Sequence, residues 1–104
     1  MRSSKRLEVL LKLTAGPDAG SFGWYALAME YRGLGRLDDA LDTFRTLREK
    51  DPAYVPMYQM CGMMLIDAGR REEAEDWLRT GLEAARRVGN AKTAEEIEQA
   101  LKGA

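Results

Sequence analysis

An internal repeat constrains this chain more than any single residue, because residues 21 to 88 hold the same pattern twice at a spacing of 34. Identical residues include Gly35, Arg36, Ala40, Asp42, Arg45 and Thr46, paired with Gly69, Arg70, Ala74, Asp76, Arg79 and Thr80. An internal repeat of this length usually stacks supersecondary units that cannot bury their apolar faces alone. The spacing therefore predicts a repeat protein that binds another chain.

The first copy carries a more specific motif. It reads Trp24-x2-Leu27-Ala28-x2-Tyr31, followed by Gly35, Ala40-x3-Phe44 and Pro52. This resembles the tetratricopeptide repeat, whose pattern is W-x2-L-G-x2-Y, A-x3-F and P, with Ala28 in place of the small Gly. The resemblance implies an all-α solenoid of antiparallel helix pairs, about six helices in total, with right-handed superhelical stacking.

The second copy is looser than the first. It reads Tyr58-x2-Cys61-Gly62-x2-Leu65, followed by Gly69 and Ala74-x3-Leu78, and Arg86 stands where the closing proline is expected. Without a proline to stop it, the second helix of this copy is expected to run to Val88 and to end at Gly89-Asn90. The glycines between the helices, Gly33-Leu34-Gly35 and Ala68-Gly69, predict turns at helix ends and not phosphate-binding loops.

We predict a single domain over 1–104. The first repeat spans 21–54 and the second spans 55–88. An amphipathic helix over 3–14 is expected to cover one end of the array, and a helix over 91–102 is expected to cover the other. Either Asn90 or Thr93 is expected to cap the last helix, and Thr93-x-x-Glu96 fits a capping box.

The amino-terminal segment is neither a secretory signal nor a membrane span by its pattern. Its apolar run is interrupted by Glu8 and Lys12, and it does not approach the roughly 20 apolar residues of a spanning helix. Residues 1 to 14 carry four basic groups and one acidic group. This excess has two interpretations, a solvated helix face or a contact with an acidic partner.

Composition and charge exclude several classes of function. Sixteen basic and seventeen acidic residues give a net charge of −1, which provides no reason to expect binding to nucleic acid or to a membrane. The chain has no histidine and one cysteine, Cys61, which falls on the packing stripe of its helix. A lone cysteine forms no internal disulfide, which is compatible with a cytoplasmic protein.

We predict that the chain is not an enzyme and binds no cofactor or metal. The acidic pairs Asp38-Asp39 and Glu72-Glu73 lie at the same repeat position, near the start of each second helix. Their negative charge interacts favourably there with the positive end of the helix dipole. Neither pair has the convergent ligands that a catalytic or metal site needs. An enzyme stays a third hypothesis, for which no nucleophile and base can be named.

The candidate site is the surface of the first helices of the two repeats. In the family that this chain resembles, those helices line a concave groove whose exposed residues select the ligand. The resemblance implies that the groove residues here are Phe22, Tyr25, Met29, Arg32, Gln59, Met63 and Ile66. Members that hold a partner's terminal carboxylate carry Lys and Asn at the positions of Tyr25 and Met29, so acidic chaperone tails are not the expected ligand.

Methionines are concentrated beside this surface, at Met57, Met60, Met63 and Met64. Flexible methionine side chains accept apolar helices of varied sequence, but they also fill irregular gaps in a core. The spacing of Met57, Met60 and Met64 favours the core, whereas the helical phase of Met63 favours the binding surface. Two functional hypotheses follow: an adaptor or scaffold that binds an apolar helix or peptide, and a structural module that forms homodimers through the same surface.

Overall fold

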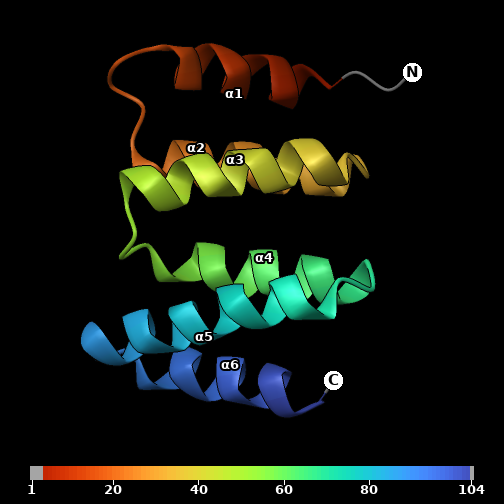
Figure 1. Ribbon diagram of the computed structural model, residues 1–104. Coiled ribbons are helices and arrows are strands. Elements are labelled where there is room, and N and C mark those ends of the chain that lie inside the picture. Colours follow the sequence, from red (N-terminus) through yellow and green to blue (C-terminus); the bar gives the residue numbers. More distant parts are fainter. Residues whose placement is uncertain (1–3, 104) are drawn as a thin grey trace. The chain divides into compact units, whose positions relative to one another are not determined.

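The computed structural model describes residues 4–103, and these residues form six α-helices and no strand (Figure 1). The helices are α1 (Lys5–Ala15), α2 (Ser21–Gly33), α3 (Leu37–Lys50), α4 (Val55–Asp67), α5 (Arg71–Arg87) and α6 (Ala91–Gly103). The prediction of an all-α protein is confirmed. Ser3, the first residue of the helix predicted over 3–14, lies outside the described residues, as do residues 1, 2 and 104.

The described residues fall into two compact units, which are treated one at a time below. Unit 1 contains α1, α2 and α3 and ends at Asp51, and unit 2 begins at Pro52 and contains α4, α5 and α6. Unit 1 therefore holds both helices of the first predicted repeat and unit 2 holds both helices of the second, while residues 52–54, predicted as the end of the first repeat, belong to unit 2. The single domain over 1–104 and the right-handed superhelical stacking stay predictions.

In unit 1, α1 packs antiparallel to α2. Ser4 caps α1 by accepting a hydrogen bond from the Leu7 backbone N–H at 3.1 Å, and its hydroxyl donates to Glu30 Oε2 near the end of α2 at 2.9 Å. The core between the two helices consists of Leu7, Leu10, Ala26 and Leu27, with Trp24, Tyr31 and Leu34 packed against it. The apolar spacing of three and four residues on each helix places these side chains on one face.

Small side chains of α2 and α3 lie in the core of unit 1. Ala28 on α2 and Ala40 on α3 have no exposed surface, and Phe44 of α3 is equally buried. Two contacts join the start of α2 to the end of α3. Ser21 Oγ donates to Asp51 Oδ2 at 2.6 Å, and Lys50 Nζ lies 5.3 Å from the centre of the Trp24 ring.

In unit 2, two glycines allow α5 to pack against its neighbours. A Cβ atom at Gly62 of α4 would lie 2.5 Å from Leu78 Cδ2 of α5. A Cβ atom at Gly81 of α5 would lie 2.4 Å from Tyr58 Cβ of α4. Both distances are far below van der Waals contact. At Gly81 the neighbouring Cβ is fixed to the backbone of α4, so glycine is required there, whereas a Cβ at Gly62 would force the Leu78 side chain to shift.

The same turn joins α2 to α3, α4 to α5, and α5 to α6. Each turn has a glycine with φ of 75°, and these are Gly35, Gly69 and Gly89. In each turn the next backbone N–H donates back to the preceding helix, from Arg36 to Tyr31 O (2.9 Å), from Arg70 to Leu65 O (2.8 Å) and from Asn90 to Ala85 O (2.8 Å). The predicted end of the long fifth helix agrees with this geometry, because α5 runs to Arg87 and Gly89 forms the turn.

The last helix, α6, packs against α5 and also touches α4. Asn90 caps it by accepting a hydrogen bond from the Thr93 backbone N–H at 3.1 Å. Because α6 begins at Ala91, Thr93 already lies in its first turn, and the proposed Thr93-x-x-Glu96 capping box is wrong. At the other end, Arg71 Nη2 of α5 donates to the Leu101 carbonyl at 2.8 Å.

Candidate protein-binding surface

In unit 1, the predicted site residues form one row along α2. Phe22, Tyr25, Met29 and Arg32 follow one another at spacings of three and four, so they share one side of the helix. Phe22 is 70% exposed, whereas the other three side chains are partly buried. The Phe22 ring centre lies 6.5 Å from that of Tyr25, which in turn lies 6.5 Å from that of the buried Phe44. Tyr25 therefore rests on the core, and Phe22 is the side chain that protrudes.

In unit 2, the corresponding row on α4 borders a small apolar pocket. Met63 is 39% exposed and Ile66 is partly buried. They line a pocket of about 220 Å³ together with Asp67 of α4 and with Ala100 and Gly103 of α6. Ala100 and Gly103 could not be predicted from the sequence as site residues, because their place depends on how α6 packs against α4.

The third predicted residue of this row, Gln59, is held by α6. Its Nε2 atom donates to Glu96 Oε1 at 3.1 Å. Gln59 is partly buried, so α6 occupies one side of the row that the sequence analysis assigned to a partner. Within the predicted row on α4, the apolar side chains that remain at least partly exposed are therefore Met63 and Ile66.

The methionines of α4 divide between the core and the surface. Met57 has no exposed surface and Met64 is 5% exposed, so both belong to the core of unit 2. Met60 is partly buried, and Met63 points outward. Cys61 is fully buried beside them, as its place on the packing stripe predicted.

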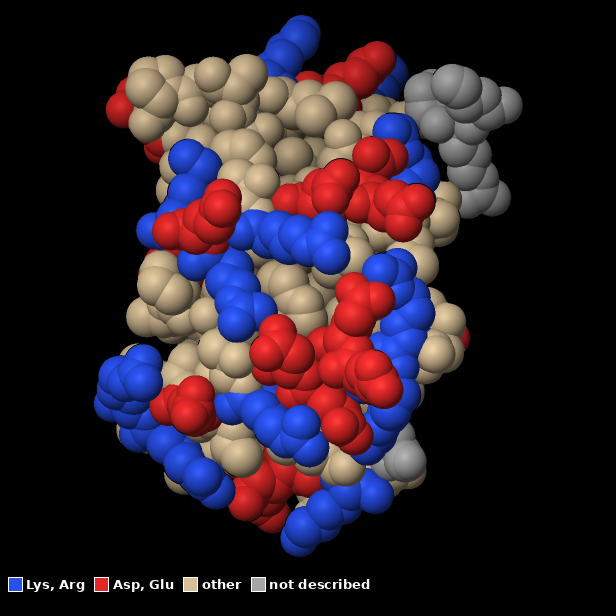
Figure 2. Space-filling model, viewed as in Figure 1, with Lys and Arg blue, Asp and Glu red and all other residues tan. Residues whose placement is uncertain are grey.

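The second helices of the two repeats carry mixed charges instead of an apolar surface. Basic and acidic side chains alternate over α3 and over α5 (Figure 2). One ion pair recurs at equivalent positions, Arg36 with Asp39 at 2.8 Å and Arg70 with Glu73 at 2.7 Å. Exposed pairs of this kind contribute about 0–1 kcal/mol each, and they stabilise the first turn of each helix. Because the two partners have opposite charges, these pairs do not form a purely acidic or purely basic binding surface.

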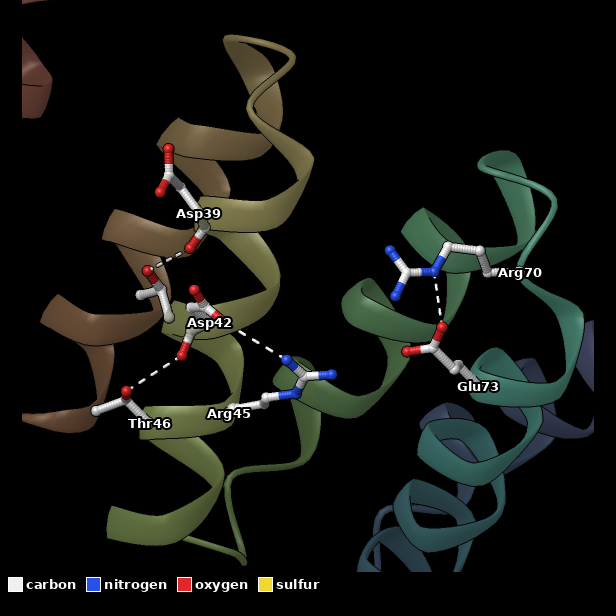
Figure 3. A network of polar contacts seen from close by, with 7 residues as sticks. Asp39, Asp42, Arg45, Thr46, Arg70 and Glu73 are labelled. Atoms are coloured by element: carbon white, nitrogen blue, oxygen red, sulfur yellow. Dashed lines mark hydrogen bonds and ion pairs between the residues drawn. The ribbon is translucent and has the colours of Figure 1, made fainter.

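Further along α3, polar side chains bond to their own helix. Asp42 pairs with Arg45 at 3.4 Å, and its carbonyl accepts from the Thr46 hydroxyl at 3.1 Å (Figure 3). On α5 the equivalent arginine, Arg79, lies 3.3 Å from Glu75. These contacts of Asp42 and Glu75 each lie within a single helix.

No metal-binding cluster and no membrane-spanning helix is present among residues 4–103. No three Cys, Asp or Glu side chains in this part of the chain come together as a metal site requires. No helix in the same part is long and apolar enough to cross a membrane.

The chain was compared with known families and structures. The family model of the tetratricopeptide repeat matches residues 31–101. The chain belongs to the tetratricopeptide repeat family. This confirms the family resemblance inferred from the Trp24 and Phe44 motif. Tetratricopeptide repeat proteins are in general non-catalytic modules for protein interactions.

Solved tetratricopeptide repeat structures are similar to this chain. The solution structure of a tetratricopeptide repeat domain protein from Salinibacter ruber is 34% identical, with a TM-score of 0.76 over 83% of this chain and 86% of that one. A crystal structure of a tetratricopeptide repeat domain protein from the same organism, also 34% identical, gives a TM-score of 0.72 over 79% and 91%. A Bordetella parapertussis protein shares the fold at 24% identity, with a TM-score of 0.79 over 98% and 87%. No curated protein sequence matches the chain.

Proposed function

We propose that this tetratricopeptide repeat protein is an adaptor that binds an apolar helix or extended peptide of another protein. The proposed binding residues are those that the sequence predicts on the first helix of each repeat, α2 and α4. The observation that carries the proposal is Phe22, which leaves 70% of its surface exposed next to Tyr25 and Met29 on one side of α2. Burial of such a side chain contributes about 1.5–3 kcal/mol, which a partner would recover on binding.

The surface of unit 2 supports the same proposal. The pocket beside Met63 and Ile66 has a volume of about 220 Å³ and is bordered mainly by apolar atoms. Sites for small molecules or cofactors usually enclose roughly 300–1,000 Å³. A pocket of this size suits one or two apolar side chains of a partner better than a cofactor. We accordingly propose a non-catalytic, cytoplasmic role without cofactor, metal, nucleic acid or membrane lipid.

The proposal is tested by capturing partners from a lysate of the native organism. The tagged chain is compared with Phe22→Ser and Met63→Ser, and with Val88→Ser as the matched control for an exposed apolar side chain outside the rows. Tyr25 is not substituted, because its ring contacts the core residue Phe44. We expect a partner that binds wild type and Val88→Ser but is lost from Phe22→Ser or Met63→Ser, with unchanged helicity in every variant. Equal capture by all four proteins would contradict the proposal.

The alternative is that the same surface binds a second copy of the chain. Sedimentation velocity over the micromolar range separates the two functions. A dimer of the wild type that becomes monomeric in Phe22→Ser would establish the homodimer and contradict the adaptor. A monomer throughout that range would eliminate the homodimer.

A further inference from the structure

Helix α1 carries exposed apolar side chains that a capping helix does not need. Val9 is 64% exposed and Leu13 is 48% exposed. Helices that end a repeat array usually have a polar outer face, which keeps the array soluble. Val9 and Leu13 are one turn apart, so they form a short apolar stripe on α1.

This stripe lies on the same side of unit 1 as Phe22. Arg6, Val9 and Leu13 follow one edge of α1 at spacings of three and four. At one end of the edge, Arg6 Nε lies 3.2 Å from Glu30 Oε1 of α2. At the other end, Leu13 Cδ2 lies 3.1 Å from the position of a Cβ atom on Gly23.

The remaining contacts agree with this placement. On α2, Phe22 and Glu30 lie on one line with Ala26, because they are separated by steps of four residues. The opposite edge of α2, with Trp24 and Tyr31, packs against the core that Leu7 and Leu10 of α1 form. Val9, Leu13 and Phe22 therefore form one exposed apolar surface across α1 and α2, here named the α1–α2 patch.

The charges around this patch indicate the kind of partner. The helical neighbours of Val9 one turn away are Lys5, Arg6, Lys12 and Leu13, and all four are exposed. The remaining charge on α1 is Glu8, and Arg6 already pairs with Glu30 of α2, so Lys5 and Lys12 are the cations that this helix offers to a partner. Both basic and acidic side chains are visible over α1 (Figure 2). Two copies of α1 facing each other would bring these cations together, which disfavours a second copy as the occupant.

We propose that the α1–α2 patch binds an acidic amphipathic helix of another protein. This inference rests on the proposed adaptor function and extends its surface from the repeats onto α1. The apolar face of the partner helix covers Val9, Leu13 and Phe22, and its carboxylates pair with Lys5 and Lys12. The patch continues towards Tyr25, whose ring centre lies 6.5 Å from that of Phe22.

Two matched synthetic peptides test the proposal. Both have about 18 residues, to favour helix formation in water, and the same Leu and Phe face. One carries Glu and the other carries Lys at the polar positions. We expect fluorescence anisotropy to show that the wild-type chain binds the Glu peptide at least about tenfold more tightly than the Lys peptide, and that salt weakens this binding.

Paired variants show whether the patch is the site. Val9→Ser should weaken binding of the Glu peptide by about tenfold, whereas Val88→Ser, a matched valine that is 56% exposed on unit 2, should leave it unchanged. Lys12→Glu should weaken it about fivefold, whereas Lys92→Glu on α6 should not. Circular dichroism checks that all four variants keep the wild-type helix content.

Several outcomes would overturn the proposal. These are equal binding of the two peptides, no binding of the Glu peptide at ~1 mM, or wild-type affinity in Val9→Ser. Uptake of wild type but not Val9→Ser by vesicles of phosphatidylcholine and phosphatidylserine, roughly 3:1, would assign the patch to a membrane surface instead. A dimer that Val9→Ser dissociates would assign it to a second copy.

The adaptor function can survive the failure of this inference. If Val9→Ser still captures the lysate partner that Phe22→Ser loses, the α2 row binds the partner without α1. In that case the proposed function stands and the role of α1 is wrong. If neither substitution affects capture and the Glu peptide does not bind, both proposals fail.

Discussion

Gly81 provides the sharpest test of how unit 2 is packed. A Cβ atom at this position would lie 2.4 Å from Tyr58 Cβ of α4 and 3.3 Å from Ile97 Cδ1 of α6. Tyr58 is 1% exposed and Ile97 is fully buried. Because Tyr58 Cβ is bonded directly to the backbone of α4, it cannot rotate out of the way. Gly81→Ala must therefore push α4 and α5 apart.

Two opposing terms determine the size of this effect. Replacing glycine by alanine inside a helix stabilises it by about 0.5–1 kcal/mol. Carbon atoms prefer separations of about 3.5–4.0 Å, so the new contact is too short by more than ~1 Å. Overpacking of this kind costs about 1–3 kcal/mol, and the rigid neighbour places Gly81 at the upper end. We expect a net loss of about 2 kcal/mol in the free energy of unfolding, or a Tm lower by roughly 10 °C.

Urea and thermal denaturation followed by circular dichroism measure this loss. Gly33→Ala is the matched control, because Gly33 also lies in a helix, has no atom within 4 Å of its would-be Cβ, and lacks a positive φ. The control should equal or slightly exceed the wild type in stability. If Gly81→Ala proved as stable as Gly33→Ala, the close approach of α4 and α5 described here would be refuted.

Three further substitutions test the turns, the caps and one buried hydroxyl by urea denaturation. Gly69→Ala should cost about 1–2 kcal/mol, since φ of 75° is unfavourable for alanine, and an unchanged midpoint would contradict that turn geometry. Asn90→Ala should cost about 1 kcal/mol through loss of the α6 cap, with Lys92→Ala as a neutral comparison. Tyr58→Phe should cost about 1 kcal/mol, because the hydroxyl donates to the Pro52 carbonyl at 2.6 Å; wild-type stability would mean that this bond contributes nothing.

Much of the fold could be predicted because its signals are local in the sequence. The repeat spacing and the motif around Trp24 and Phe44 identify helices that agree with α2 to α5 in type and order. Arg86 stands where the repeat pattern has a proline, and this difference correctly predicted a longer α5, because a helix continues until its backbone can turn. The turn that ends α5 depends on Gly89, which has a positive φ and can be recognised in the sequence.

The site was harder to predict because it depends on contacts between helices. The spacing placed Gln59 on the same row as Met63, but it could not show that α6 lies against Gln59. The exposed edge of α1 was not predicted for the same reason. Apolar residues of α1 lie on several sides of the helix, and only the packing of α1 on α2 shows that Val9 is exposed to solvent. The capping box failed because Asn90 caps the helix before Thr93 can do so.

The turn at Gly89 makes α5 the second helix of one hairpin and the first helix of the next. At Gly81, α5 contacts both Tyr58 of α4 and Ile97 of α6. This shared helix limits how the gene can grow by duplication. If residues 55–88 were copied as a block, the inner copy of α5 would lose Ile97 as its neighbour and meet a different helix at Gly81. A longer array at this end would therefore require new substitutions on α5 as well as a new copy of the repeat.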